Sequence, residues 1–297
     1  SQIVWACARV RAHHKTLFDD IADHIVKTNS RNDLTQQFMT KSLVNILWAY
    51  AAVNHKHDGL MMAGARTFVN QMTKFNKTAD VSMLAWSFAA QDTYSTAQKE
   101  GCDLWKVIRR GANRLGFPAK FKPYEQHAIA MAAHFVGDAS PTEQEMVNAG
   151  GAGDQHGMMT MPRLTASARC VIQALLGVPA ARPFKVVGEY CVPGVGLVDI
   201  AFPELKLAIE VDGPTHHVRP LEAQPGTTGH GCGSDALRRA LMKKAGWTAV
   251  HISVVEWGNV RPDMRTAYLR QLLDGKLVHA DELNRPKPAF KPPPPPL

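Results

Sequence analysis

Length, composition and charge limit what this chain can be. It has 297 residues, which suits two domains, and its 34 Lys and Arg against 26 Asp and Glu give a net charge of +8. This excess favours a polyanionic partner, a nucleic acid or a membrane surface, over a merely basic protein without such a partner. Five scattered cysteines without a Cys-x-x-Cys pair argue against a zinc finger or a disulfide framework, and no apolar run reaches membrane-spanning length.

Residues 1–140 are helical and repeat internally. Leu43–Ala52 and Val81–Ala90 both contain a Trp, an aromatic residue two positions later and then two Ala, with an offset of 38 residues. Weaker copies begin at Trp5 and Ile129. Between the copies we expect second helices at Leu17–Lys27, Leu60–Met72 and Leu104–Leu115. Two helices in a unit of about 40 residues predict an α-solenoid of helical hairpins, and an ordinary helical bundle is the alternative.

The third of these second helices carries a basic stripe. Lys106, Arg110 and Arg114 recur every four residues, away from the apolar positions of the same helix. Like charges at this spacing repel one another, and an RNA phosphate would relieve the repulsion. The alternative is a solvated face without a partner.

Composition marks the domain boundaries. Residues 141–163 contain a Gly-rich run and are predicted to form a linker. A second domain is expected over residues 164–278, and residues 279–297 form a Pro-rich tail that should be extended.

The second domain is predicted to have the element order α-β-β-β-α-β-α. Its strands are short, apolar and bounded by turn residues, as buried strands are. The predicted helices are Thr165–Leu176, Asp235–Ala245 and Arg261–Asp274, and the predicted strands are Lys185–Cys191, Leu197–Phe202, Leu205–Val211 and Thr248–Val255.

Three carboxylates interrupt two of these apolar strands. Asp199 lies within one strand, while Glu210 and Asp212 flank Val211 at the end of the next and therefore point to the same face. Buried carboxylates are costly unless they are paired, hydrogen-bonded or bound to a cation. Together with His216, these acids predict a functional site.

These residues also carry a resemblance to a known family. The run from Asp199 to His216, followed by Gly246-Trp247 and Glu256-Trp257, resembles a RAP domain over roughly residues 182–276. The resemblance implies a restriction-endonuclease-like, or PD-(D/E)XK, core of the very-short-patch-repair-like branch. More loosely, the N-terminal repeats resemble octotricopeptide or FAST-kinase-like repeats.

The nuclease resemblance implies one set of roles. Asp199 and Glu210 would hold Mg²⁺, and His216 would serve as general acid or base. Asp212 stands where the commoner nuclease pattern has Lys, which puts the activity in doubt. RAP domains are associated with organellar RNA, so we expect an inactive nuclease-like platform that needs no cofactor. The alternative is a Mg²⁺-dependent endonuclease in organellar RNA processing, with Asp199, Glu210, Asp212 and His216 as its catalytic residues.

The expected function is that of an organellar RNA-binding protein, a structural component of a mitochondrial ribosome or similar ribonucleoprotein. Its partners would be RNA, in the first place ribosomal RNA, and neighbouring proteins, with no membrane and no small-molecule substrate. A scaffold that contacts only proteins is a further alternative, and a plastid is the alternative location. Besides the basic stripe, the expected RNA contacts are His216, His217, Arg219, Arg238, Arg239, Lys243 and Lys244.

Overall fold

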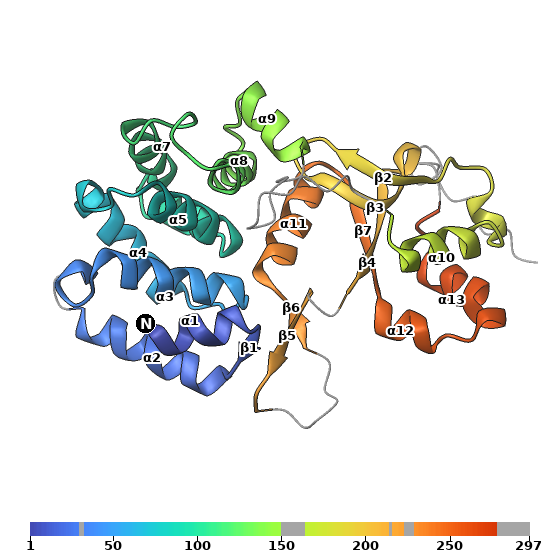
Figure 1. Cartoon of the computed structure of the whole chain (residues 1–297), viewed down its shortest axis with the longest axis horizontal. Coiled ribbons are helices and arrows are strands. Elements are labelled where there is room, and N and C mark those ends of the chain that lie inside the picture. The colour runs from blue at the N-terminus through green and yellow to red at the C-terminus, as the bar shows by residue number, and fades with distance from the viewer. Residues whose placement is uncertain (30–32, 150–163, 214–215, 223–228, 278–297) are drawn as a thin grey trace, which may run out of the picture.

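The chain folds into a helical N-terminal half and a mixed helix-and-sheet C-terminal half that pack side by side (Figure 1). The computed structural model describes residues 1–29, 33–149, 164–213, 216–222 and 229–277. The Pro-rich tail predicted at residues 279–297 lies outside these ranges. Within the described part of the chain, no helix is long and apolar enough to cross a membrane.

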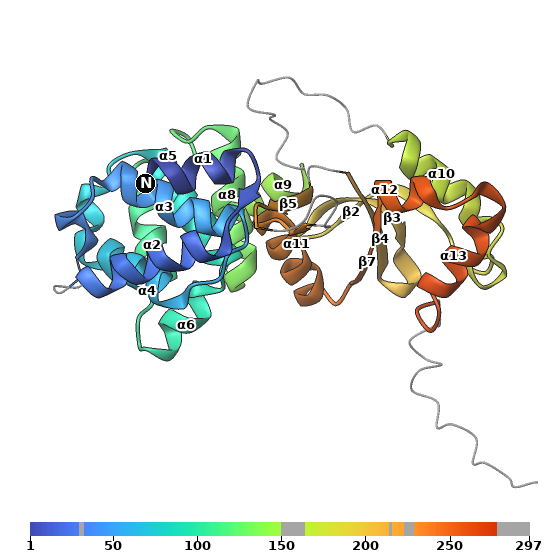
Figure 2. The ribbon, with the colours of Figure 1, turned by 90° about the horizontal axis from the view of Figure 1, so that it is seen from below.

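The helices that carry the sequence repeat form the first layer of the helical half. Each one packs against the next in chain order, because the repeated Ala residues let neighbouring helices approach closely. Figure 2 shows this layer above the second one. The first-layer helices are α1 (Gln2–Arg9), α3 (Thr40–Ala52), α5 (Thr78–Ala90) and α8 (Pro123–Val136).

The intervening helices form the second layer. Helix α4 packs against α2 and α6, and α7 packs against α4, α5 and α6. The three second helices predicted from the sequence are present with boundaries shifted by a few residues, and α6 is an addition that the repeat did not predict. The second-layer helices are α2 (Lys15–Thr28), α4 (Asp58–Gln71), α6 (Thr93–Lys99) and α7 (Leu104–Arg114).

The predicted linker at residues 141–163 begins instead with a helix, α9 (Pro141–Asn148). Its sequence contains a capping box, in which the Ser140 hydroxyl accepts from the Glu143 backbone N–H and the Glu143 carboxylate accepts from the Ser140 backbone N–H. Pro141 at the first helical position favours the same start. Helix α9 packs against α8 and β3, so residues 141–148 belong to the folded body. The Gly-rich remainder, residues 150–163, lies outside the described residues.

A four-stranded sheet in the order β2-β3-β4-β7 is the centre of the C-terminal half. Strands β2, β3 and β4 are antiparallel neighbours, and β7 runs parallel to β4. The predicted order α-β-β-β-α-β-α is present as α10-β2-β3-β4-α11-β7-α13, with β5, β6 and α12 as additions. The strands are β2 (Val187–Val192), β3 (Gly196–Phe202), β4 (Leu207–Asp212) and β7 (Thr248–Ser253). The helices are α10 (Ala166–Leu175), α11 (Gly233–Lys244), α12 (Val254–Asn259) and α13 (Arg265–Leu272).

Helices cover both faces of this sheet. Ile200 and Ile209, which lie opposite each other, belong to a core shared with α10 and α13. Ala201 and Ala208 also lie opposite each other and belong to the large core that includes Leu237 of α11 and the first-layer helices. Because side chains alternate along a strand, the sequence pattern decides which residues face the helical half.

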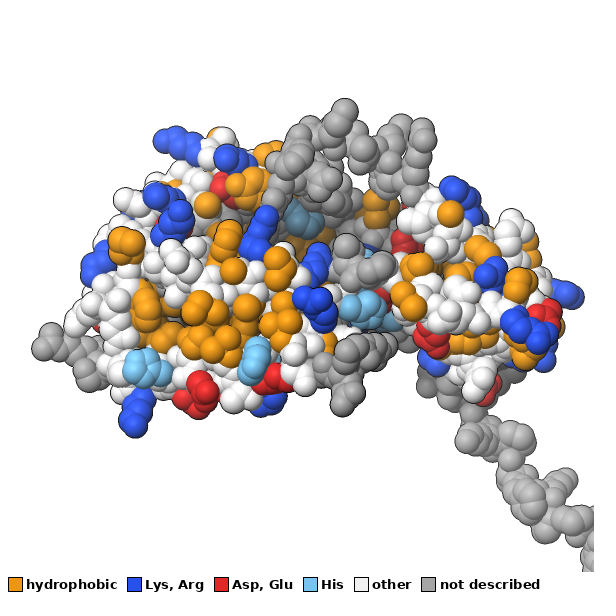
Figure 3. Space-filling model, turned by 60° about the horizontal axis from the view of Figure 1, so that its bottom comes forward, with side chains coloured by type: hydrophobic (Ala, Val, Ile, Leu, Met, Phe, Trp, Pro, Cys, Tyr) orange, Lys and Arg blue, Asp and Glu red, His pale blue; other side chains and the backbone are white. Residues whose placement is uncertain are grey.

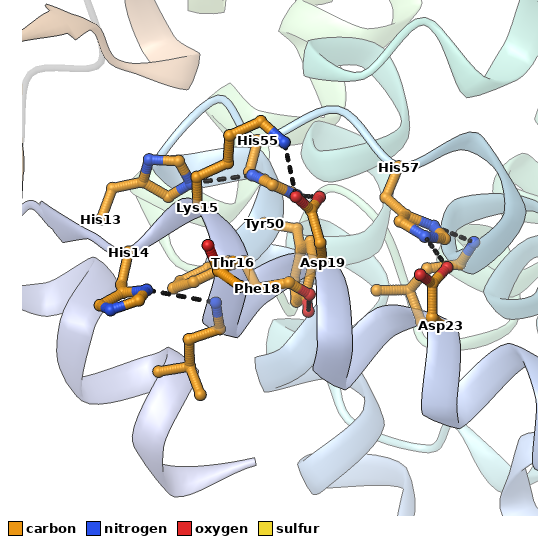
Figure 4. A network of polar contacts seen from close by, with 12 residues as sticks. His13, His14, Lys15, Thr16, Phe18, Asp19, Asp23, Tyr50, His55 and His57 are labelled. Atoms are coloured by element: carbon orange, nitrogen blue, oxygen red, sulfur yellow. Dashed lines mark hydrogen bonds and ion pairs between the residues drawn. The ribbon is translucent and has the colours of Figure 1, made fainter. Parts of the chain in front are cut away.

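A second, three-stranded sheet joins the two halves. Strand β1 (Ala12–His13) of the helical half pairs in parallel with β5 (His217–Pro220), and β5 pairs with β6 (His230–Gly231). His13 lies at this junction and contacts His55, and Figure 4 shows the polar network that continues to Asp19. The small sheet and α11 together hold the two halves against each other.

Candidate functional site

A cleft of about 770 Å³ lies where the four-stranded sheet meets the helical half. It brings together five residues that the sequence singled out, from strands β3 and β4, the segment after β4 and helix α11. Trp86 of α5 and Met131 of α8 form the opposite wall. The five predicted residues are Asp199, Glu210, Asp212, His216 and Arg238.

Strand alternation places the acids in this cleft. Asp199 lies two residues before Ala201, and Glu210 lies two residues after Ala208, on the face that α11 covers. The prediction that Glu210 and Asp212 point to one face is confirmed, since Asp212 contacts His251, the residue directly opposite Glu210. Two carboxylates this close on neighbouring strands repel each other unless each has a partner.

Groups of the protein itself satisfy the first two carboxylates. The Val211 backbone N–H donates to Asp199 Oδ2 at 2.8 Å. Arg238 Nε donates to Glu210 Oε1 at 2.7 Å, and the Asp199 backbone N–H donates to Glu210 Oε2 at 3.4 Å. Glu210 is buried, so its pairing with Arg238 offsets the cost of removing the carboxylate from water.

Alternating His and Asp side chains line the rest of the cleft. His251 Nδ1 lies 2.8 Å from Asp212 Oδ2, and His216 Nδ1 lies 3.0 Å from Asp235 Oδ1 and 3.8 Å from Asp212 Oδ1. The hydrogen bond to Asp235 raises the pKa of His216, which favours the imidazolium form. Burial alone would raise the pKa of Asp235, but hydrogen bonds from His216 and Cys232 outweigh it and hold that pKa below its usual value.

The two acids that the nuclease resemblance assigns to Mg²⁺ are engaged within the protein. Mg²⁺ is usually held by one or two carboxylates that share it with several waters. Asp199 and Glu210 instead accept hydrogen bonds from a backbone amide and a guanidinium. Within the described ranges, no three His, Cys, Asp or Glu side chains form a group that could hold a metal ion. The cleft therefore presents an internally bonded polar surface that includes His216, whose imidazolium form is favoured by Asp235.

The predicted RNA contacts on α11 divide into two groups. Arg239 and Lys243 are exposed, one turn apart. Arg238 instead faces the cleft and pairs with Glu210, and Lys244 bonds to the Phe135 carbonyl, with its Nζ 4.3 Å from the Phe135 ring centroid. The first group can meet a phosphate without breaking a hydrogen bond or ion pair to another described residue.

The other predicted contacts lie on the small sheet and on α7. Arg219 of β5 is exposed, while His217 is half-buried. The three cations of the α7 stripe are exposed but do not line the cleft. Arg114 differs from the other two because its guanidinium donates to the carbonyls of Met72 and Phe75, just beyond the end of α4.

Of the cleft residues that the sequence did not single out, His251 and Trp86 show what a sequence pattern can and cannot reveal. His251 lies directly opposite Glu210 in the parallel β4–β7 pair. Alternation along the predicted strand at 248–255 could have placed His251 beside the acids. Trp86 had no such signal, because the sequence gives no register between the repeat helices and the sheet.

Comparison with known proteins gives a partial similarity. No protein-family model matches the chain. A chloroplastic RAP domain-containing protein of Oryza sativa subsp. japonica is 36% identical over 86 residues. This similarity supports a RAP domain. The aligned segment covers 29% of this chain and 12% of that relative, so this chain matches only a small part of the relative's length.

Proposed function

We propose that this chain is an organellar RNA-binding protein whose RAP domain and helical layers together hold an RNA. The similarity to a RAP domain-containing protein carries this proposal. The net charge of +8 supports it, because neutralising phosphates is the largest sequence-independent source of RNA affinity. The relative is named chloroplastic, which favours a plastid over the predicted mitochondrion.

The proposed phosphate contacts are two pairs of exposed cations, one on α7 and one on α11. Lys106 and Arg110 extend from α7, and no hydrogen bond or ion pair joins either side chain to another described residue. Arg239 and Lys243 form a similar pair on α11, although the Arg239 guanidinium also packs over Gly231. Each pair places two positive charges one turn apart, and a phosphate between them would relieve their mutual repulsion.

We also propose a fold type for each half of the chain and a class of RNA that it binds. The consecutive packing of the repeat helices supports an α-solenoid of the octotricopeptide or FAST-kinase-like type. The element order of the C-terminal half supports a nuclease-like scaffold. Within an organelle, a ribosomal RNA in a ribonucleoprotein is the proposed RNA, and the internal bonds of Asp199 and Glu210 favour binding over cleavage.

Charge reversal on α7 tests the proposal. The double variant Lys106→Glu, Arg110→Glu should weaken binding of the full chain to organellar RNA and reduce the salt slope of log K by about 2, one for each lost phosphate contact. Fluorescence anisotropy at several salt concentrations measures both. Lys27→Glu with Lys99→Glu changes the net charge equally on other second-layer helices and should have less effect.

Two results would count against this proposal. Equal losses in both double variants would show that only net charge matters and that α7 is not a contact. Cleavage of the RNA in the same mixtures after addition of Mg²⁺, abolished by Asp199→Asn, would establish the endonuclease alternative instead.

A further inference from the structure

A second cleft, of about 520 Å³, crosses the first layer of the helical half. Three tryptophans at the repeated sequence position line it, namely Trp5 of α1, Trp48 of α3 and Trp86 of α5. Tyr124, at the start of α8, continues the row. We call these four side chains and the hollow between them the aromatic groove. Each helix of the first layer thus contributes one aromatic ring to the same surface.

These tryptophans differ from the others in the chain. Trp257 is 3% exposed and belongs to the core, Trp247 packs against the Tyr190 ring, and Trp105 donates to Asp138. In contrast, Trp5 is 39% exposed, and Trp48 and Trp86 are half-buried. None of these three donates its indole N–H to another described residue. The groove therefore keeps large apolar rings and their polar edges available to a ligand.

Positive charge borders the groove. The Arg9 guanidinium lies 5.7 Å from the centre of the Trp5 ring, and Lys122 Nζ lies 5.9 Å from the centre of the Tyr124 ring. Glu125, which is the acidic side chain in the lining, is buried and accepts from the Lys122 backbone N–H. A ligand that combines flat rings with negative charge complements this surface. Figure 3 shows Lys and Arg side chains beside a band of hydrophobic side chains on the helical half.

The groove and the cleft of the RAP domain are neighbours, because Trp86 lines both of them. A smaller hollow that contains Arg9, Arg11, Trp48 and Trp86 also reaches Ser234 at the start of α11, which lines the cleft as well. One ligand that spans these neighbouring hollows would reach from α1 to His216.

We propose that the aromatic groove binds single-stranded RNA by stacking bases on its rings. The inference rests on the proposed function and adds the strand form of the RNA and the place where its bases lie. Successive bases stack on aromatic side chains while cations meet the backbone, as in other proteins that bind single strands. Packed helices lie about 8–10 Å apart, so the row offers about one ring per base. In a duplex the bases are already stacked and cannot reach the rings.

Substitution of two groove tryptophans tests this inference in the full chain. Trp5→Leu and Trp48→Leu should each weaken binding of a twelve-residue oligouridine about 10-fold, because stacking is lost. The salt slope should not change, since no cation is removed. Trp5→Phe should retain most of the affinity. Trp105→Leu, outside the groove, should bind like the wild type, and thermal unfolding of each variant checks that it is folded.

The outcomes separate this inference from the proposed function. Wild-type affinity in the two Leu variants, with the α7 double variant still impaired, would overturn the groove and leave RNA binding intact. Equal affinity of the wild type for the oligouridine and its duplex with oligoadenosine would also overturn it. A Leu variant that changes only self-association, measured by sedimentation, would mark the groove as a contact between copies. Absence of any RNA binding by the wild type would overturn both proposals.

Discussion

At the scale of single residues, the hydrogen bonds of a carboxylate decide its role. The nuclease resemblance assigns Asp199 and Glu210 to a metal ion, but in the structure their oxygens accept from Val211 and Arg238. Arg238 is one of the cations expected to bind RNA from sequence alone, and here it neutralises a buried acid. A cation can pair with an acid of the protein or with an RNA phosphate. Its attraction to a buried acid is stronger, because little water screens the two charges.

Loss of Arg238 should therefore destabilise the fold. In Arg238→Leu, the buried Glu210 carboxylate loses its partner, and the free energy of unfolding should fall by about 2–3 kcal/mol. Urea unfolding at pH 7 measures the change. Adding Glu210→Leu should restore part of the stability, while Arg239→Leu, one residue away and exposed, should change little. A larger loss in Arg239→Leu than in Arg238→Leu would contradict this account.

At the scale of elements, the small sheet is a polar junction in which histidine side chains contact one another. His13 of β1 is buried, and its Nε2 lies 2.8 Å from His55 Nδ1 (Figure 4). His55 Nε2 in turn lies 3.0 Å from Asp19 Oδ1, and the ring of His230 in β6 lies 5.1 Å from that of His13. Burial, and then the charges of His55 and His230, lower the pKa of His13 from 6.5 to about 4, while Glu222 and Asp19 act in the opposite sense.

The junction should weaken in acid. Because the pKa of His13 is lower in the folded chain than in the unfolded chain, the unfolded state binds more protons between pH 6.5 and about 4. Stability is therefore lost as pH falls through this window, by about 2 kcal/mol between pH 7 and 5 for this group. Urea unfolding at both values should show a smaller pH effect in His13→Gln than in the wild type. His24→Gln, which alters an exposed histidine, should retain the wild-type effect, and an unchanged pH effect in His13→Gln would refute the assignment.

At the scale of the whole molecule, α11 is the helix that packs against both halves. It packs against the sheet on one side and against α3, α5 and α8 on the other. Its first residue, Gly233, approaches the end of α3 so closely that a Cβ atom would lie 1.8 Å from the Ala51 carbonyl oxygen. The same large hydrophobic cluster extends from Val4 in α1 to Met242 in α11.

Gly233→Ala should separate the halves. The added methyl group cannot be accommodated without moving α11 away from α3, so the free energy of unfolding should fall by about 1–3 kcal/mol. Calorimetry should show a lower melting temperature and a broader or divided transition. In Gly258→Ala on α12, the Cβ meets nothing within 4 Å, and stability should stay the same or rise. Equal losses in both variants would show that the close approach to Ala51 does not matter.

The sequence by itself determined the local structure. The spacing of apolar residues predicted the repeat helices and the order of helices and strands in the C-terminal half, and alternation placed Glu210 and Asp212 on one face. These features depend on residues close together in the chain, where the geometry of helix and strand leaves few choices. The start of α9 could also have been predicted, because Ser140 and Glu143 form a capping box and Pro141 follows Ser140. The Gly-rich run after this helix suggested a linker instead.

Only the tertiary structure decided what the functional residues contact. Strand β1 has two residues, too few to show a pattern, and its partner β5 lies about two hundred residues away. The pairing of Glu210 with Arg238 and the row formed by Trp5, Trp48 and Trp86 also depend on how elements pack. Such contacts form between the surfaces of different elements. A sequence pattern within one element does not determine how two elements lie relative to each other. The core fixes that position, and with it which polar groups stay free for a ligand.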